Sequence, residues 1–355
     1  MMADGSLNMS IDNDIYLMAA NESINASFDN DEYLMMANGS INASTENDDY
    51  LTYDSNFEFP KLYKTIRNCV AWAIIGLVLS SLFGNIMIIA VMLQKRNRKS
   101  STSSFFIALA VSDMSLALSV SFERWLLLIY NVSVYGINSY ITTTKVILTY
   151  SNVQFSSWML ACITVERVLS IAMPFRIKEI CSKTRAEVII FIVFVVILCL
   201  NTVEFTLLVD IRYIEGMGMI HINKVDDGEL IIAWTDFANS FFIPINIIVI
   251  GSVYIIVNLL RVNVNKQVTN KHRNKSVTMT LLGANIVFVL TMSPYVFLHL
   301  ARFHFNSLYL FQTVSHIFMF LSDMNCALNF FVYVLSGAKF RSDVMQLLGF
   351  KIAKP

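Results

Sequence analysis

Seven long apolar stretches are the feature that most constrains how this chain can fold. The hydrocarbon core of a bilayer is about 30 Å thick, and a helix that rises about 1.5 Å per residue needs about 20 largely apolar residues to cross it. At 355 residues, 55% hydrophobic and 15% charged, the chain also has too little polar surface to cover a soluble globule. We therefore predict an all-α membrane protein, a bundle of seven transmembrane helices. The predicted spans are residues 69–94, 103–130, 140–172, 186–209, 230–260, 276–301 and 309–335.

The distribution of basic residues predicts the orientation of these helices. The first, third and fifth connections, together with the C-terminus, contain 17 lysines and arginines, and the opposite side contains six. Because basic loops stay in the cytosol, we expect an extracellular N-terminus and a multi-pass protein of the plasma membrane. No short apolar segment with a cleavage site precedes residue 60, so the first span is expected to act as an uncleaved insertion signal.

Three regions of the chain differ in composition. Residues 1–60 contain 12 acidic and no basic residues, and residues 2–52 hold three repeats of 17 residues. A segment with few apolar residues and uniform charge cannot bury enough surface to fold, so we expect a disordered extracellular tail. Residues 61–337 form the predicted seven-helix domain, and residues 338–355 a short amphipathic cytoplasmic helix and tail. Asn-X-Ser acceptors predict glycosylation of the outer tail at Asn8, Asn21, Asn25, Asn38 and Asn42.

Two roles remain open for this acidic tail. It can serve as a solvating stalk that binds no ligand. Alternatively, tyrosines that stand beside acidic residues are sulfated and help to capture a basic ligand. The tyrosines concerned are Tyr16, Tyr33, Tyr50 and Tyr53.

Polar side chains within the spans are a strong functional signal, because each is costly to place in a membrane. Asp113 puts a carboxylate deep in the second span, and residues four apart share one face of the third span and of the seventh. Such groups can act only as hydrogen-bond partners between helices. However, an isolated carboxylate at this depth needs a proton or a cation, and oxygen ligands suit a hard ion, so we expect an allosteric sodium site. Its predicted members are Asp113, Asn85, Asn152, Ser156, Asn325 and Asn329.

An ordered set of motifs runs from about residue 70 to residue 345. It consists of Glu166-Arg167 followed by Ile171 and Pro174, of Pro244, of Phe288, Met292 and Pro294, and of Asn329-Phe330-Phe331-Val332-Tyr333 before Phe340-Arg341. In this order the chain resembles the rhodopsin-like (class A) G-protein-coupled receptors, and the Asn-Phe pair resembles that of invertebrate neuropeptide receptors. The resemblance implies a receptor that binds an extracellular ligand, expected to be a peptide, and activates a heterotrimeric G protein.

The resemblance assigns Glu166, Arg167 and Tyr333 to coupling with the G protein. Arg167 lies 25 residues after Thr142, about 38 Å along a helix, at the cytoplasmic rim. There Glu166 or a neighbouring helix can hold the arginine in the resting state. The alternative is an arginine that merely extends to the membrane interface. Residues assigned to the conformational switch and hinges are Pro244, Phe288, Met292 and Pro294, and the prolines weaken their helices because each lacks a backbone donor.

Several residues that are usual in this family are missing. Thr142 occupies the place of a cysteine, and residues 210–229 contain no cysteine, so the usual outer disulfide cannot form and the loop over the pocket is expected to be less constrained. Met292 stands where the family has a switch tryptophan, and Phe330 replaces a proline. The five cysteines are all expected to be reduced, and they are Cys69, Cys162, Cys181, Cys199 and Cys326.

Ligand class is narrowed by exclusion. Thr149 stands where amine receptors have an aspartate, and Asp323 stands where opsins have the retinal lysine. The acidic side chains of the outer half can receive a cationic group of a peptide, or they can pair internally with Arg124 or Lys145. The candidate ligand-binding residues are Glu123, Lys145, Asp236, Tyr295, His299, Arg302 and Asp323.

Other function classes fit the sequence less well. A transporter-like or orphan seven-helix protein without G-protein signalling is the alternative, but the spans show no inverted repeat. An enzyme is not expected, because the five histidines lack metal-ligand spacing and no phosphate loop or nucleophile elbow occurs. The expected partners are therefore a peptide, a G protein and the lipid bilayer, with no nucleic acid and no cofactor beyond sodium.

Overall fold

The structure is a computed structural model that describes residues 40–42, 52–54, 61–130, 132, 138–214, 218–264, 271–301 and 308–350. Arg302 and the tail residues Asn8, Asn21, Asn25, Asn38, Tyr16, Tyr33 and Tyr50 lie outside these ranges. For Asn42, Tyr53 and His299 the structure describes the backbone only. Two short antiparallel strands, β1 (Ser40–Asn42) and β2 (Thr52–Asp54), are described within the tail region.

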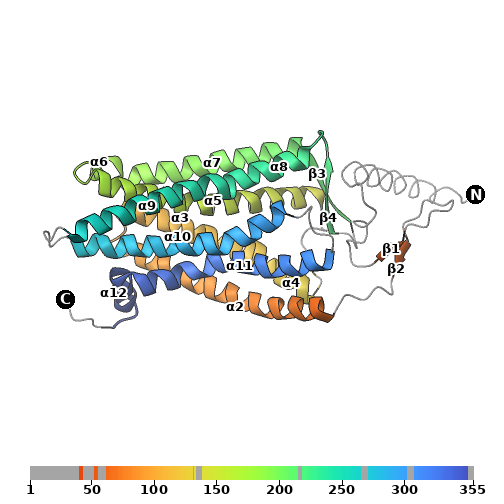
Figure 1. The fold of residues 1–355 in the computed structure, drawn as a ribbon, viewed down its shortest axis with the longest axis horizontal. Coiled ribbons are helices and arrows are strands. Elements are labelled where there is room, and N and C mark those ends of the chain that lie inside the picture. The colour runs from red at the N-terminus through yellow and green to blue at the C-terminus, as the bar shows by residue number, and fades with distance from the viewer. Residues whose placement is uncertain are drawn as a thin grey trace, which may run out of the picture.

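Seven helices in the described ranges are long and apolar enough to cross a membrane, which confirms the predicted fold class. They lie side by side along the long axis of the molecule (Figure 1). In chain order the spans are α2 (Lys61–Met92), α3 (Ser101–Leu116) continued by η2 and α4 (Phe122–Tyr130), α5 (Ser139–Ala172), α7 (Lys183–Leu207), α8 (Gly228–Asp236) continued by η4 and α9 (Ile243–Val264), α10 (Lys271–Leu300) and α11 (Leu308–Ser336).

The most visible deviation from the predicted span boundaries is the first helix, which begins eight residues earlier than predicted, at Lys61. Two shorter helices lie outside the spans: α6 (Ile177–Ile180) and the amphipathic α12 (Ala338–Leu347). The helix α12 follows α11 directly and lies at the end of the bundle opposite to the hairpin β3–β4 (Figure 1).

Two of the spans contain a π-helical turn that the sequence analysis did not predict. In the second span η2 (Ala117–Ser121) precedes Glu123 and Arg124, and in the fifth span η4 (Phe237–Phe242) precedes Pro244. A proline has no backbone N–H to donate to the preceding turn, so a wider turn before Pro244 avoids a lost hydrogen bond. Each π turn changes the face on which the following side chains lie.

The helices differ in how much of their surface other helices cover. About half of the apolar window is buried in α5 and in the second span, but only 17% in α7. The large side chains on the exposed face of α7 are Phe191, Ile192, Val196 and Leu200, each at least 44% exposed. Since lipid is as apolar as these side chains, such a face is stable only against the bilayer.

The outer end carries a β-hairpin, formed by β3 (Val209–Ile214) and β4 (Gly218–Asn223), within the predicted loop 210–229. Val209 and Ile211 are fully buried in a cluster with Val146, Ile147, Phe205 and Ile232. The Ser139 hydroxyl also donates to the Ile211 carbonyl over 3.2 Å. The expectation of a less constrained loop was therefore wrong at β3, because buried apolar side chains anchor it in place of a disulfide.

Gly228 shows how tightly the chain returns from this hairpin to α8. A Cβ at Gly228 would lie 2.5 Å from the Leu208 carbonyl oxygen. That oxygen accepts a hydrogen bond from the Lys224 backbone N–H over 2.9 Å. Only glycine permits this approach, since any other side chain would push the loop away from α7.

Candidate functional site

The Asp113 carboxylate is the centre of a polar cluster inside the bundle. It is completely buried on α3. The Ser156 hydroxyl of α5 donates to one carboxylate oxygen over 3.0 Å, and the Asn329 amide of α11 donates to the other over 2.8 Å. Three helices that are far apart in the sequence therefore meet at one carboxylate. The structure brings together these three of the six residues predicted for the sodium site.

The other three predicted members have different surroundings. The Asn85 amide donates to the carbonyl oxygens of Ser81 and Cys326, each over 2.9 Å. Asn152 pairs instead with Ser112, whose hydroxyl donates to the Asn152 side-chain oxygen over 2.6 Å. Asn325 is buried on α11. No direct bond from these three asparagines to Asp113 occurs among the described contacts.

A cation at this cluster would meet oxygen ligands of the right kind. The Asp113 carboxylate supplies the charge, and the Ser156 hydroxyl lies next to it. The side-chain oxygen of Asn85 is buried and has no hydrogen-bond partner in the described part of the chain. Hard oxygen atoms suit sodium, so the donor set fits, although Asn152 is turned towards Ser112.

Two ion pairs connect helices in the outer half of the bundle. The Lys145 ammonium of α5 pairs with the Glu123 carboxylate of α4, and the Arg124 guanidinium of α4 pairs with the Asp323 carboxylate of α11. All four side chains are between 11% and 15% exposed. In so dry a setting a charge is tolerated only beside its counter-charge. The structure thus has the internal pairing that the sequence left open for these residues.

A third polar contact in the outer half involves two residues that the sequence analysis missed. The Gln154 amide of α5 donates to the Asp236 carboxylate of α8 over 3.0 Å. The Asn201 amide of α7 donates to the Gln154 side-chain oxygen over 2.9 Å. Both were detectable as amides inside apolar helices, the same signal that drew attention to Asn152. Of the remaining candidates, Tyr295 is half-buried on α10.

The Glu166-Arg167 pair lies near the C-terminal end of α5, where α3 begins. The Thr102 hydroxyl donates to the Glu166 carboxylate over 2.9 Å, and the Arg167 guanidinium donates to the same Thr102 oxygen. The Ser101 hydroxyl donates to Glu166 as well. The arginine is therefore held by a neighbouring helix through a neutral hydroxyl, one of the two arrangements that the sequence predicted.

Tyr333 of α11 lies beside the same cavity as Arg167. Its ring is 1% exposed and packs edge-on against Phe106 and Phe340, with centroids 5.1 and 5.7 Å away. Its hydroxyl has no hydrogen-bond partner among the described residues. Tyr333 and Arg167 both line a cavity of about 190 Å³ at the inner end of the bundle. The cavity leaves room for Arg167 to change its partner and for the Tyr333 hydroxyl to gain one.

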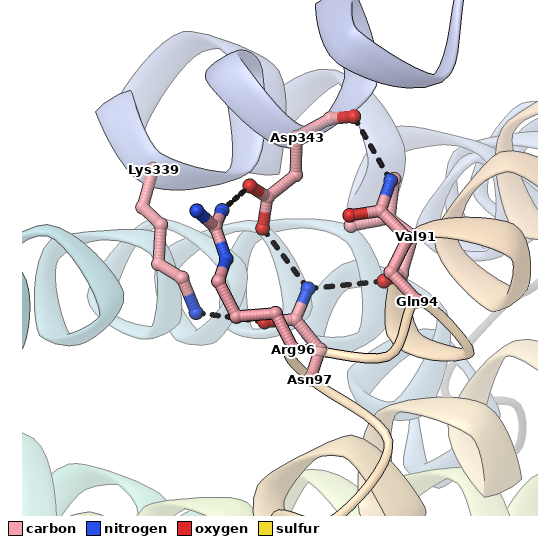
Figure 2. Close-up of polar contacts among 6 residues, drawn as sticks. All are labelled: Val91, Gln94, Arg96, Asn97, Lys339 and Asp343. Atoms are coloured by element: carbon pink, nitrogen blue, oxygen red, sulfur yellow. Dashed lines mark hydrogen bonds and ion pairs between the residues drawn. The ribbon is translucent and has the colours of Figure 1, made fainter. Parts of the chain in front are cut away.

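Polar side chains of α12 and of the loop between α2 and α3 line this cavity. Figure 2 shows how they form a clamp that joins the two segments. Asp343 is 2% exposed, pairs with the Arg96 guanidinium and accepts a hydrogen bond from the Asn97 amide over 2.9 Å. The Lys339 ammonium donates to the Asn97 side-chain oxygen over 2.9 Å, and the Gln94 amide donates to the Asp343 carbonyl over 3.1 Å. The sequence predicted the helix but not these contacts.

The residues assigned to the switch lie in the core of the bundle. Phe288 and Met292 are buried on α10, and the Ser322 hydroxyl of α11 contacts the Met292 sulfur over 3.0 Å. Phe330 packs against α2, where a Cβ at Gly84 would lie 2.7 Å from the Phe330 Cβ. The Phe330 side chain thus occupies the space that a side chain at position 84 would need.

A buried hydrogen-bond network ties the inner half of α10 to its neighbours. The Asn285 amide donates to the Ser252 hydroxyl of α9 over 2.8 Å and to the Thr164 hydroxyl of α5 over 3.2 Å. Thr164 also packs against α9, because a Cβ at Gly251 would lie 2.6 Å from its methyl carbon. The three helices therefore have a polar contact that must break or slide if the inner half of α10 moves.

Comparison with known proteins agrees with this architecture. Residues 84–333 match the family described as 7 transmembrane receptor (rhodopsin family). The chain is 28% identical to the C-X-C chemokine receptor type 5 of Rattus norvegicus, over 81% of this chain and 77% of that receptor. It is 22% identical to the thyrotropin-releasing hormone receptor of Bos taurus, over 81% and 79%. The chain therefore belongs to the rhodopsin family of seven-transmembrane G-protein-coupled receptors, multi-pass proteins of the plasma membrane.

Proposed function

We propose that this receptor binds an extracellular peptide or small protein and activates a heterotrimeric G protein. The observation that carries the proposal is the arrangement around Arg167, a half-buried arginine held by a neutral hydroxyl beside an inner cavity. An arginine held in this way can change partners when α3 and α5 move, since none of the described contacts joins its guanidinium directly to a carboxylate. The names of the related chemokine and hormone receptors support a ligand of peptide chemistry.

The outer half of the bundle supports a charged ligand. The pairs Glu123–Lys145 and Arg124–Asp323 sit between helices at low exposure. A peptide with a cationic group can take the place of Lys145 or Arg124 on a carboxylate, so that the carboxylate keeps a counter-charge while the displaced side chain moves to another partner. Exchange of partners in this way would link ligand binding to a change in helix contacts.

The coupling role of Arg167 is tested by nucleotide exchange on a purified G protein. Arg167→Ala is expected to abolish ligand-stimulated exchange and to leave ligand binding largely intact, because the side chain lies far from the outer pairs. Arg185→Ala, an exposed residue at the start of α7, serves as the matched control and should signal normally. Full signalling by Arg167→Ala would refute the assigned role.

We also propose that the Asp113 cluster binds sodium in the resting state. Sodium would then oppose an agonist, because each ligand favours a different conformation of the same receptor. Raising sodium at constant ionic strength is expected to weaken agonist binding, and Asp113→Asn should remove this dependence. A variant that keeps the full sodium effect would refute the site.

The acidic tail is proposed to be extracellular and glycosylated, and to attract a basic ligand by its charge. Electrostatic attraction acts over a Debye length of about 8 Å at physiological salt and mainly raises association rates. Deletion of residues 1–52 should therefore slow association more than it speeds dissociation. An unchanged association rate would leave the tail as a stalk.

Treatment of intact cells with a peptide N-glycosidase should lower the apparent mass of the full chain.

A further inference from the structure

Unpaired nitrogen atoms gather at the outer ends of α2, α4 and α11. The Arg124 Nε, the Trp125 indole nitrogen and the His316 Nδ1 are buried and have no hydrogen-bond partner in the described part of the chain. Trp125 belongs to the same apolar cluster as Ile66 of α2 and Phe320 of α11, and Phe320 lies one turn along the helix from His316. Because most buried polar atoms in folded proteins have a partner, three unpaired nitrogens in one region indicate a missing acceptor.

The three nitrogens lie beside a fourth donor group, the Arg67 guanidinium of α2. Arg67 donates to a backbone carbonyl of α4 over 3.0 Å, and both Arg67 and Arg124 lie within electrostatic reach of His316. The His316 Nε2 is 3.4 Å from the Tyr63 hydroxyl. When that hydroxyl donates to Nε2, the neutral ring carries its proton on Nδ1, which is then a donor. We refer to Arg67, Arg124, Trp125 and His316 as the donor cluster.

The donor cluster has an unbalanced positive charge. Asp323 neutralises Arg124, whereas none of the described ion pairs includes Arg67, whose hydrogen-bond partner in the described ranges is a neutral carbonyl. The guanidinium groups, the indole and the imidazole all offer N–H donors, and a carboxylate, which only accepts, forms short and strong hydrogen bonds with arginine. The cluster therefore fits a carboxylate beyond the one that Asp323 supplies.

Asp236 of α8 presents the opposite situation. Its half-buried carboxylate accepts a hydrogen bond from the neutral Gln154 amide over 3.0 Å, and no described cation forms an ion pair with it. A second half-buried carboxylate, Glu204 of α7, lies within electrostatic reach of Asp236. Two neighbouring carboxylates in a partly dry site favour a cation. A positive group can therefore bind at Asp236 without displacing another, in contrast to the ion-paired Glu123 and Asp323.

Tyr295 of α10 connects the two regions. Both Asp236 and Arg124 lie within electrostatic reach of its hydroxyl. The donor cluster and the Asp236 carboxylate are therefore close enough for one short segment of a ligand to contact both, with its negative group towards α2 and α11 and its positive group towards α8.

We propose that the ligand of this receptor is a bipolar peptide segment, with a carboxylate bound at the donor cluster and an amine or guanidinium bound at Asp236. The inference rests on the proposed peptide receptor function and adds the charge and the orientation of the ligand. The carboxylate is that of a C-terminus or of an acidic side chain. Arg67, Trp125 and His316, which the sequence analysis did not select, then determine specificity for the anionic end.

The test is affinity selection on the full chain in phosphatidylcholine nanodiscs. The probe is a mixture of hexapeptides in four forms, with the amino end free or acetylated and the carboxyl end free or amidated. Retained peptides, identified by mass spectrometry, are expected to carry both a cationic and an anionic group, enriched about ten-fold over peptides that lack either one, as expected for one charge-assisted hydrogen bond. Retention without this charge preference would overturn the bipolar ligand and leave a peptide receptor, whereas no retention above empty nanodiscs would overturn both.

Four variants locate the two ends of the ligand. Arg67→Gln should remove the preference for an anionic group and keep that for a cationic group, and Asp236→Asn should do the reverse. Trp125→Phe keeps an aromatic ring without the indole N–H and should weaken the preference for an anionic group about three- to ten-fold. Lys61→Gln removes a positive charge from an exposed position of α2 and should change neither preference.

A misfolded variant would lose all peptides, so the loss of one preference alone reports on contact with the ligand. An unchanged preference for anionic groups in both Arg67→Gln and Trp125→Phe would overturn the role of the donor cluster.

Discussion

The two ends of the bundle are held by different sets of interactions. At the outer end, buried apolar side chains anchor the hairpin β3–β4, and below it two ion pairs join helices at low exposure. At the other end, Arg167 has a neutral hydroxyl as partner, and the Asp343 clamp joins α12 to the loop between α2 and α3 through amide and charged groups. Figure 1 shows these two ends on either side of the helices.

This difference determines which contacts can rearrange at each end of the bundle. A buried ion pair breaks at high cost unless another charge replaces one partner, so the outer end responds to a charged ligand and to little else. A hydrogen bond to a hydroxyl contributes far less, so the contacts of Arg167 can rearrange when the helices shift. A receptor needs this combination, since a specific stimulus outside must move a responsive surface inside. The following predictions test the comparison.

The largest effect is expected at the outer ion pairs. Arg124→Met removes one partner and leaves the Asp323 carboxylate at low exposure without its guanidinium, which should cost about 3–5 kcal/mol. The double variant Arg124→Met with Asp323→Leu should recover most of this loss, because no buried charge remains. Thermal unfolding in detergent measures both. Equal destabilisation by the single and double variants would show that the loss does not come from an unpaired Asp323 carboxylate.

The next largest effect is expected at the hairpin. Ile211→Ala leaves a cavity in the cluster below β3 and should lower the free energy of unfolding by about 2–5 kcal/mol. Val225→Ala, in the same loop but 49% exposed, is the matched control and should change stability by less than about 0.5 kcal/mol. Similar melting temperatures for the two variants would mean that apolar packing does not replace the missing disulfide.

A smaller effect is expected at the inner clamp. Asp343→Ala removes the acceptor for the Asn97 amide and the partner of Arg96, which should lower the free energy of unfolding by about 1–3 kcal/mol. Most of this loss should come from the buried hydrogen bond to Asn97, because Arg96 is exposed to water, which weakens its ion pair. Gln346→Ala changes an exposed residue of the same helix and is the control. Hydrogen exchange of residues 338–347 should rise in the first variant only. Unchanged protection would show that α12 is held by its apolar face alone.

Thr102 offers a subtler change at the inner end. Thr102→Val keeps the shape of the side chain but removes the hydroxyl between Glu166 and Arg167, a loss of about 0.5–1.5 kcal/mol. The resting state should become less favoured, so nucleotide exchange without ligand should rise up to about ten-fold. Thr102→Ser retains the hydroxyl and should behave like the natural chain. Unchanged basal exchange in Thr102→Val would contradict the role of this hydroxyl.

The smallest effect is expected from reducing agents. All five cysteines are free, and Cys326 is buried between helices. Mild treatment with dithiothreitol should therefore leave ligand binding and thermal unfolding unchanged, whereas a receptor with an outer disulfide should lose both. A loss of binding in this chain would require a disulfide that the structure does not contain.

The existence and order of the spans could be predicted from the sequence, because the length of an apolar stretch is a local property, whereas their ends differ by up to eight residues. The third span was expected at 140–172 and is found at Ser139–Ala172. The hairpin β3–β4 was missed, although Ile211, Tyr213 and Ile220 alternate with polar residues, because the missing cysteines drew the interpretation towards an unconstrained loop. The π turns were missed since they depend on packing rather than on residue pattern.

The sequence by itself determined that this chain crosses the membrane seven times, and it marked Asp113 and Arg167 as candidates for function, because a charge inside an apolar helix is costly. Only the tertiary structure decided the partners. Arg124 and Asp323 are 199 residues apart, and Asn97 and Asp343 are 246 residues apart. Such pairs form because distant helices pack side by side, and no spacing within one helix encodes which residues then meet.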